Sequence, residues 1–253
     1  MSRVLALVVA LGAVGCVRGL PYTVVAEEQV PAPPLPTQAE WVEASALWRR
    51  LREGAPRRPY VERIRLRVKD PRTGKLVQVR GAVAVHPGKA ARMLLVGPGG
   101  TTAVDLWVTP ERWRVSIPAA QIERRGGRDL DDALGLPIGF ARWWLLAPVE
   151  GELIFAQSSG VGGKGKKLWF RTSANGVVTI DAPGEFLVAT RRAPDGRRDS
   201  VIWPSASPSP SAPLEASYHD LTLGLTVDVA IEAVMPDEPD PAAFVDPDAP
   251  GAP

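Results

Sequence analysis

The chain has 253 residues, 45% of them hydrophobic, so it can bury a sizeable core and is not of the disordered class. Its 30 Lys and Arg nearly balance its 28 Asp and Glu, and the net charge of +2 argues against a dedicated nucleic-acid partner. The 24 Gly and 26 Pro favour many turns over long helices.

The first 16 residues, MSRVLALVVALGAVGC, have the layout of a secretory signal peptide. Arg3 supplies the positive charge, and the apolar run that follows is too short to span a bilayer as a helix. The segment ends in Cys16, the single cysteine, and resembles the lipobox of bacterial lipoproteins. That resemblance implies a lipidated Cys16 as the mature N-terminus, and Val17 behind it favours the outer membrane. The alternative is a secreted protein with a free thiol.

The segment behind this anchor predicts a tether and then a helix. Residues 17 to 36 end in a Pro-rich spacer without a core of its own. In TQAEWVEASALWRRLREG, Thr37 and Glu40 form a capping-box pattern and Gly54 is a stop signal. The apolar residues of one helix face are Trp41, Ala44, Trp48 and Leu51. We expect this helix to pack on the core of the domain and not on a membrane surface.

From Tyr60 the hydrophobic period changes to two, which is typical of strands with one buried and one solvated face. Five strands are predicted first: ERIRLRVKD, LVQVRGAVAV, RMLLV, AVDLWVT and RWRVSIP. Six more follow residue 151: GELIFAQ, KKLWFRT, GVVTID, EFLVATRR, SVIWP and TLGLTVDVAIEAV. Turn signals such as Asn175-Gly176 separate them. About 11 closely spaced antiparallel strands favour one barrel-like or strongly curved sheet.

The stretch LGLPIGFARWWLLAPVEG, residues 134 to 151, interrupts the strands. Pro137 suits the first position of a helix over IGFARWWLLA. Such a helix is apolar almost all round, which is expected only where both of its faces are covered. It is either a displaceable cover over an apolar cavity or a permanent part of the core.

No constellation of catalytic or metal-binding residues is evident. His86 falls in a predicted turn, and His219 and Asp220 are strand neighbours that point to opposite faces. Two distant histidines cannot build a zinc site. GVGGKGKK matches a phosphate-binding loop except at Lys167, where Ser or Thr is needed, and a hairpin follows it in place of a helix. We therefore predict no catalytic residue, no metal and no cofactor.

Taken together, the lipobox, the capped helix, the strand run, the WW-containing insertion and the closing strands resemble the LolA/LolB-like family of periplasmic lipoprotein carriers and receptors. The resemblance covers residues 37 to 246 and includes GAVAVHPGKAARMLLVGPGG and PERWRVSIP. It implies a mainly β (α+β) fold: a strongly curved antiparallel sheet, or unclosed barrel, with helices on its concave side. The apolar cavity between them would take the acyl chains of lipoproteins.

The predicted organisation has four parts: a signal peptide (1–15), an anchor and tether (16–36), a half-barrel domain (37–236) and an acidic Pro-rich tail (237–253) that is extended or disordered at its end. The candidate lining of the lipid cavity is Trp107, Trp113, Phe140, Trp143, Trp144 and Leu145. The predicted function is binding of acyl chains or lipoproteins at the outer membrane, with a soluble periplasmic carrier as a partner. The alternative is a non-enzymatic structural or interaction lipoprotein with a filled core.

Overall fold

The computed structural model describes residues 35–53, 56–69, 71, 73–128, 138–142, 152–158, 166–171, 176–181, 186–193, 198–204, 215–222 and 224–249. Cys16, residues 17–34 of the tether and three candidate lining residues, Trp143, Trp144 and Leu145, lie outside this part of the chain. Most of the GVGGKGKK loop lies outside it as well.

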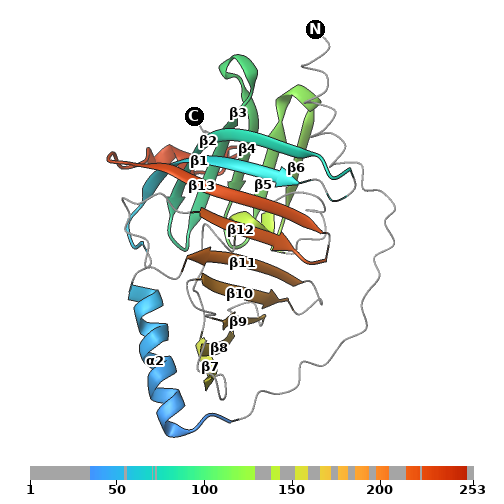
Figure 1. The fold of residues 1–253 in the computed structure, drawn as a ribbon. Coiled ribbons are helices and arrows are strands. Elements are labelled where there is room, and N and C mark those ends of the chain that lie inside the picture. Colours follow the sequence, from blue (N-terminus) through green and yellow to red (C-terminus); the bar gives the residue numbers. More distant parts are fainter. Residues whose placement is uncertain are drawn as a thin grey trace.

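One antiparallel sheet of 13 strands organises the described chain (Figure 1). At its centre, β1 (Tyr60–Lys69) pairs with β2 (Leu76–His86) on one side and with β13 (Leu225–Met235) on the other. Beyond β2 follow β3 (Ala90–Val96), β4 (Thr102–Val108), β5 (Trp113–Ile117) and β6 (Ile122–Gly126). Beyond β13 follow β12 (Glu215–Asp220), β11 (Arg198–Pro204), β10 (Phe186–Arg192), β9 (Val177–Asp181), β8 (Lys166–Arg171) and β7 (Glu152–Ser158).

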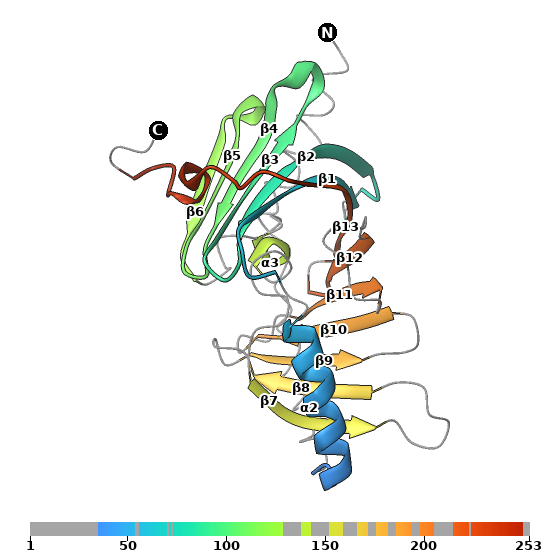
Figure 2. The ribbon, with the colours of Figure 1, turned by 90° about the vertical axis from the view of Figure 1, so that its left-hand side faces the viewer.

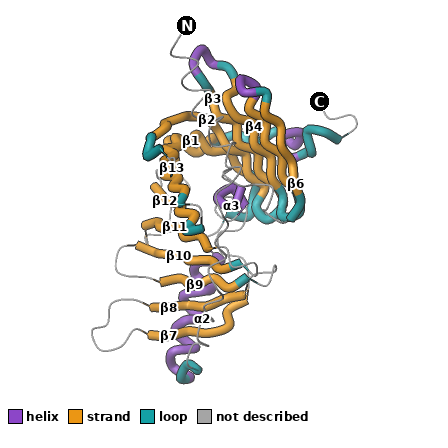
Figure 3. Tube along the Cα trace, turned by 90° about the vertical axis from the view of Figure 1, so that its right-hand side faces the viewer, coloured by secondary structure: helices purple, strands orange, loops and turns teal. Residues whose placement is uncertain are grey.

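The sheet is strongly curved but does not close, because β6 and β7 form its two edges (Figures 2 and 3). The predicted fold class, a curved antiparallel sheet or unclosed barrel, is thus confirmed. The structure adds two strands to the 11 predicted, β6 and β12. Their sequences, IERRG and EASYHD, carry too few apolar residues for a period of two to be visible. These strands depend on pairing with the neighbouring strands β5, β11 and β13.

The predicted first helix is α2 (Gln38–Glu53). Its capping box is formed: Glu40 Oε2 accepts a hydrogen bond of 2.7 Å from the Thr37 backbone N–H, and Thr37 Oγ1 accepts one of 3.3 Å from Glu40. The helix lies along β7 and β8, and the Trp48 ring contacts Phe170 with centroids 4.4 Å apart (Figure 2). This helix therefore packs on the core, as expected from its apolar face.

The concave face of the sheet carries the core. Successive side chains of a strand point to opposite faces, and the strand register aligns Val83, Met93, Leu106 and Val115 on one of them. All four are almost fully buried. None of the described helices is long and apolar enough to cross a membrane.

Candidate functional site

A short helical segment lies inside the curve of the sheet (Figures 2 and 3). It consists of α3 (Ile138–Phe140) followed by a π-type turn at residues 141 and 142. Ile138, Phe140 and Ala141 are buried, and Phe140 is only 1% exposed. The segment is the described beginning of the helix predicted over IGFARWWLLA.

Gly139 brings this helix into close contact with the sheet. A Cβ atom at this position would lie 2.8 Å from the hydroxyl oxygen of Tyr218 and 3.5 Å from Asp199 Oδ2. Arg191 Nη2 would be 3.6 Å away. The distance to Tyr218 is too short for a Cβ atom, so only glycine allows the backbone of α3 to approach this hydroxyl so closely, whereas the other two distances are ordinary van der Waals contacts.

The three groups form a buried cluster across β10, β11 and β12. Arg191 donates two hydrogen bonds to Asp199, of which the bond from Nε to Oδ1 measures 2.9 Å. The Tyr218 hydroxyl donates a third, 3.2 Å long, to Oδ2. Burial, followed by the negative charge of Asp199, raises the pKa of Tyr218 well above its ordinary value. The phenol therefore stays protonated and remains a hydrogen-bond donor.

Arg142 holds the other end of the helical segment. Its guanidinium donates hydrogen bonds to the backbone carbonyl oxygens of Thr109, Arg128 and Gly127, at 2.9, 2.6 and 2.8 Å. These carbonyls belong to the turn after β4 and to the chain just beyond β6. Residues 138 to 142 therefore connect the side of the open sheet formed by β10 to β12 with the side formed by β4 to β6.

Trp113 shares the concave face with Phe140. Its indole lies over Gly126, where a Cβ atom would come within 2.6 Å of the ring. The side chain is 1% exposed, and its Nε1 donor is buried without a hydrogen-bond partner in the described structure. An unpaired buried donor is costly and marks a position where a polar atom of a ligand would be favourable.

Trp107 lies on the opposite, convex face and does not join Trp113 and Phe140. It pairs in register with Arg114, and its Nε1 donates a hydrogen bond of 3.2 Å to the carbonyl oxygen of Phe244. The sequence AVDLWVT already indicated this placement, because Trp107 directly follows the buried Leu106 and adjacent side chains of a strand point to opposite faces. Of the six candidate lining residues, the structure thus places two on the concave face and one on the convex face.

The concave face also holds a carboxylate that the sequence interpretation missed. Glu62 pairs in register with Val83 and Val234 and lies in phase with Ile64. Burial raises its pKa to about 7. Burial and the charge of Glu62 also raise the pKa of the nearby Tyr60. The sequence indicated this site by a glutamate at a position of β1 where the alternation predicts an inward-facing apolar residue.

Neither histidine lies in a catalytic arrangement within the described chain. The His86 ring meets Phe244 edge-on at 5.5 Å, and His219 Nδ1 lies 3.3 Å from Thr226 Oγ1. The described residues contain no group of three or more His, Cys, Asp or Glu that could hold a metal ion.

No protein-family model and no curated protein sequence matches this chain. Among solved structures, it is similar to a LolA superfamily protein from Nitrosomonas europaea, with 10% identity, 80% of this chain and 97% of that chain covered, and a TM-score of 0.49. It is also similar to a structure from Vibrio parahaemolyticus whose description names an outer membrane lipoprotein-sorting protein domain (8% identity, 80% and 95% covered, TM-score 0.47). A third is a DUF1329 family protein from Desulfovibrio piger (11% identity, 81% and 97% covered, TM-score 0.43).

One of these similar structures is a member of the LolA superfamily, the family that the sequence resembles. At such identities and TM-scores the likeness assigns no activity and no residue role to this chain.

Proposed function

We propose that this protein is a lipid-anchored protein of the bacterial cell envelope that binds acyl chains or lipoproteins on the concave face of its sheet. The observation that carries the proposal is the open, strongly curved sheet with an apolar concave face. A short helical segment bearing Phe140 lies against this face, in the place where a sandwich would have a second sheet. The sequence resemblance to lipoprotein carriers and receptors supports the same class of ligand.

Binding would require α3 to move away from the sheet and would involve no covalent step. One end of the segment packs closely against Tyr218 at Gly139, and the other makes the hydrogen bonds of Arg142. Both contacts can re-form in one defined position after a ligand leaves. A segment that closes over a bound ligand in this way excludes water from the site and retains the ligand. A carbonyl oxygen of the acyl group would satisfy the unpaired Nε1 of Trp113. Trp143, Trp144 and Leu145 belong to the proposed lining as well.

The anchor would be Cys16, with residues 17 to 36 as the tether. Together they would hold the domain at the periplasmic side of the outer membrane, where it could accept lipoproteins from a soluble carrier. The intact mass of protein extracted from membranes tests this part: diacylation of Cys16 adds the mass of its lipid, whereas an unmodified Cys16 would refute the anchor.

One observation favours the second candidate function, a non-enzymatic structural lipoprotein with a filled core. Trp113 and Phe140 are each 1% exposed, as permanent core residues are. In that case the tether, the Ser- and Pro-rich sequence of residues 205 to 213 and the acidic tail would make the contacts with an envelope assembly.

Native mass spectrometry separates the two functions. We expect protein lacking residues 1 to 16, purified gently from bacteria, to retain an acyl lipid or to take up added fatty acid. The Phe140→Ala variant and the Trp143→Ala/Trp144→Ala variant should lose this ligand, whereas Trp107→Phe, on the convex face, should keep it. A bare mass with no uptake by folded protein would identify the filled-core alternative.

A further inference from the structure

The acidic tail folds back onto the convex face as far as residue 249 (Figures 1 and 2). We name residues 240 to 249, DPAAFVDPDA, the strap. It begins with the 3-10 helix η5 (Pro241–Phe244), which Asp240 caps by accepting a hydrogen bond of 2.9 Å from Ala242 N, and which packs on β2 and β3. In the described structure the strap pairs with no strand of the sheet.

Phe244 anchors the strap. Its carbonyl oxygen accepts the hydrogen bond from Trp107 Nε1, and its ring meets His86 edge-on. Trp107 is only 3% exposed although it projects from the convex face. The strap therefore covers an aromatic side chain that the sheet alone would leave to solvent.

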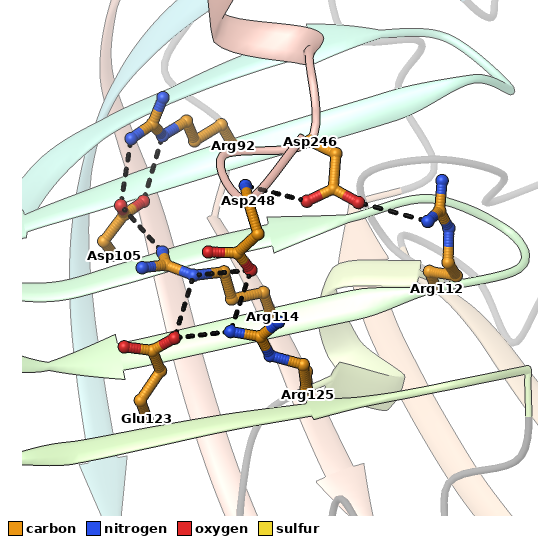
Figure 4. Close-up of polar contacts among 8 residues, drawn as sticks. All are labelled: Arg92, Asp105, Arg112, Arg114, Glu123, Arg125, Asp246 and Asp248. Carbon is orange, nitrogen blue, oxygen red and sulfur yellow. Dashed lines mark hydrogen bonds and ion pairs between the residues drawn. The ribbon is translucent and has the colours of Figure 1, made fainter. Parts of the chain in front are cut away.

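Two aspartates continue the contact at every second residue (Figure 4). Asp246 Oδ2 lies 3.2 Å from Arg112 Nη1. Asp248 Oδ2 lies 3.2 Å from both Arg114 Nε and Arg125 Nη2. Phe244, Asp246 and Asp248 thus contact the sheet at every second residue. The strap is not a strand, because its 3-10 helix is followed by a turn in which Ala249 N donates a hydrogen bond of 2.9 Å to the carbonyl oxygen of Asp246.

The surface beneath the strap is complementary to it in charge. The arginines drawn in Figure 4 are Arg92, Arg112, Arg114 and Arg125, and the sheet supplies two carboxylates among them, Asp105 and Glu123. Without the strap, this part of the face carries two uncompensated positive charges beside an exposed indole. The two aspartates of the strap neutralise it.

We propose that the convex face of β2 to β6 is a binding surface for an acidic peptide of a partner protein that adopts the same 3-10 helix and turn as the strap, and that the strap occupies this surface in cis. The fitting peptide carries an aromatic residue followed by acidic residues two and four positions later. This inference does not depend on lipid binding at the concave face, so either can fail without the other.

The contacts of the strap are of a kind that a competitor can replace. Arg112 and Arg125 are 67% and 61% exposed, and ion pairs at such positions contribute little stability each. Covalent attachment after β13 raises the local concentration of the strap to the millimolar range, which favours the cis contact over a free peptide. A partner peptide with more acidic residues, or one presented at high local concentration, displaces it.

The test uses the full chain and a fluorescent peptide of the sequence DPAAFVDPDA. The Asp246→Asn/Asp248→Asn variant weakens the strap without changing its shape. We expect this variant to bind the peptide about tenfold more tightly than the wild-type chain, with an affinity that falls as salt rises. Adding Arg112→Glu and Arg125→Glu to the variant should abolish binding. Arg63→Glu/Arg67→Glu, a matched change of exposed residues on β1, should leave it intact.

A second peptide, DPAAVFDPDA, exchanges Phe and Val and moves the aromatic ring out of phase; it should bind poorly. Absence of binding to the folded Asn variant would overturn the proposal. Binding that is insensitive to the Phe and Val exchange and to the Arg112 and Arg125 changes would also overturn it, as non-specific attraction. A dimer in size-exclusion chromatography, formed by exchange of straps between two copies, would overturn it in favour of self-association.

Discussion

The indole of Trp107 donates its N–H to the carbonyl oxygen of Phe244, a residue 137 positions further along the chain. This bond and the burial of the Trp107 ring make the strap part of the folded domain on the convex side. We therefore expect the strap to contribute to stability as well as to occupy the proposed peptide surface.

Replacement of Phe244 by Ala should lower the free energy of unfolding by about 1–3 kcal/mol, because it removes the contact of the phenyl ring with His86. Urea denaturation measures the change. The neighbouring Val245→Ala is the control, since Val245 is 43% exposed and its loss should cost less than about 0.5 kcal/mol. Equal effects of the two substitutions would show that the Phe244 ring does not cover the sheet.

Gly139→Ala should force α3 away from the cluster beneath it, because its Cβ would lie 2.8 Å from the Tyr218 hydroxyl oxygen. We expect a loss of about 1–3 kcal/mol in unfolding free energy and stronger uptake of fatty acid. Tyr218→Phe removes that oxygen, so the double variant should recover part of the loss. Gly127→Ala, with no atom within 4 Å of the added Cβ, is the control. Strictly additive effects would contradict this contact.

Asp199→Asn should destabilise the protein by about 1.5–3 kcal/mol, because it removes the charged carboxylate that accepts hydrogen bonds from Arg191 and Tyr218. Thermal melting checks this. The exposed pair of Arg128 and Glu111 provides the comparison: Glu111→Gln should change stability by about 1 kcal/mol or less. If both substitutions lower the melting temperature equally, the cluster does not stabilise the packing of β10 against β11.

Glu62 should make the protein less stable as pH rises from about 4.5 to about 7. Its pKa is raised in the folded state, so over this range the folded protein holds a proton that the unfolded chain releases. The stability present below pH 4.5 is lost as pH passes through the folded pKa, by about 1–3 kcal/mol.

Unfolding free energies measured in urea on both sides of this pH window test that prediction. Glu62→Gln should remove this part of the pH dependence and should be the more stable form above pH 7. Glu215→Gln, at an exposed position of β12, should leave the dependence unchanged. An unaltered pH profile in Glu62→Gln would assign the dependence to other groups.

Local patterns in the sequence were sufficient for the outline of the fold. The Thr37–Glu40 capping box predicted the start of α2, and the period of two predicted 11 of the 13 strands. These features depend on residues a few positions apart, so they are visible without knowledge of the fold. β6 and β12 were missed because their neighbours across the sheet, and not their own apolar residues, define them.

The candidate site was predicted less well for the same reason. Arg191, Asp199 and Tyr218 are charged or polar residues in the inward phase of their strands, but only strand order brings them together beneath Gly139. Trp107 was grouped with Trp113 by residue type, although alternation in β4 directs it to the other face.

The sequence by itself determined which side chains of each strand share a face, where the first helix starts, and that no catalytic motif stands out. The tertiary structure alone decided which face is concave, that α3 lies within it, and that the carbonyl oxygen of Phe244 accepts a hydrogen bond from Trp107 on the other side. Periodicity reports the two faces of a strand but not what lies against either of them. That depends on the order and curvature of 13 strands, which bring together residues more than 100 positions apart.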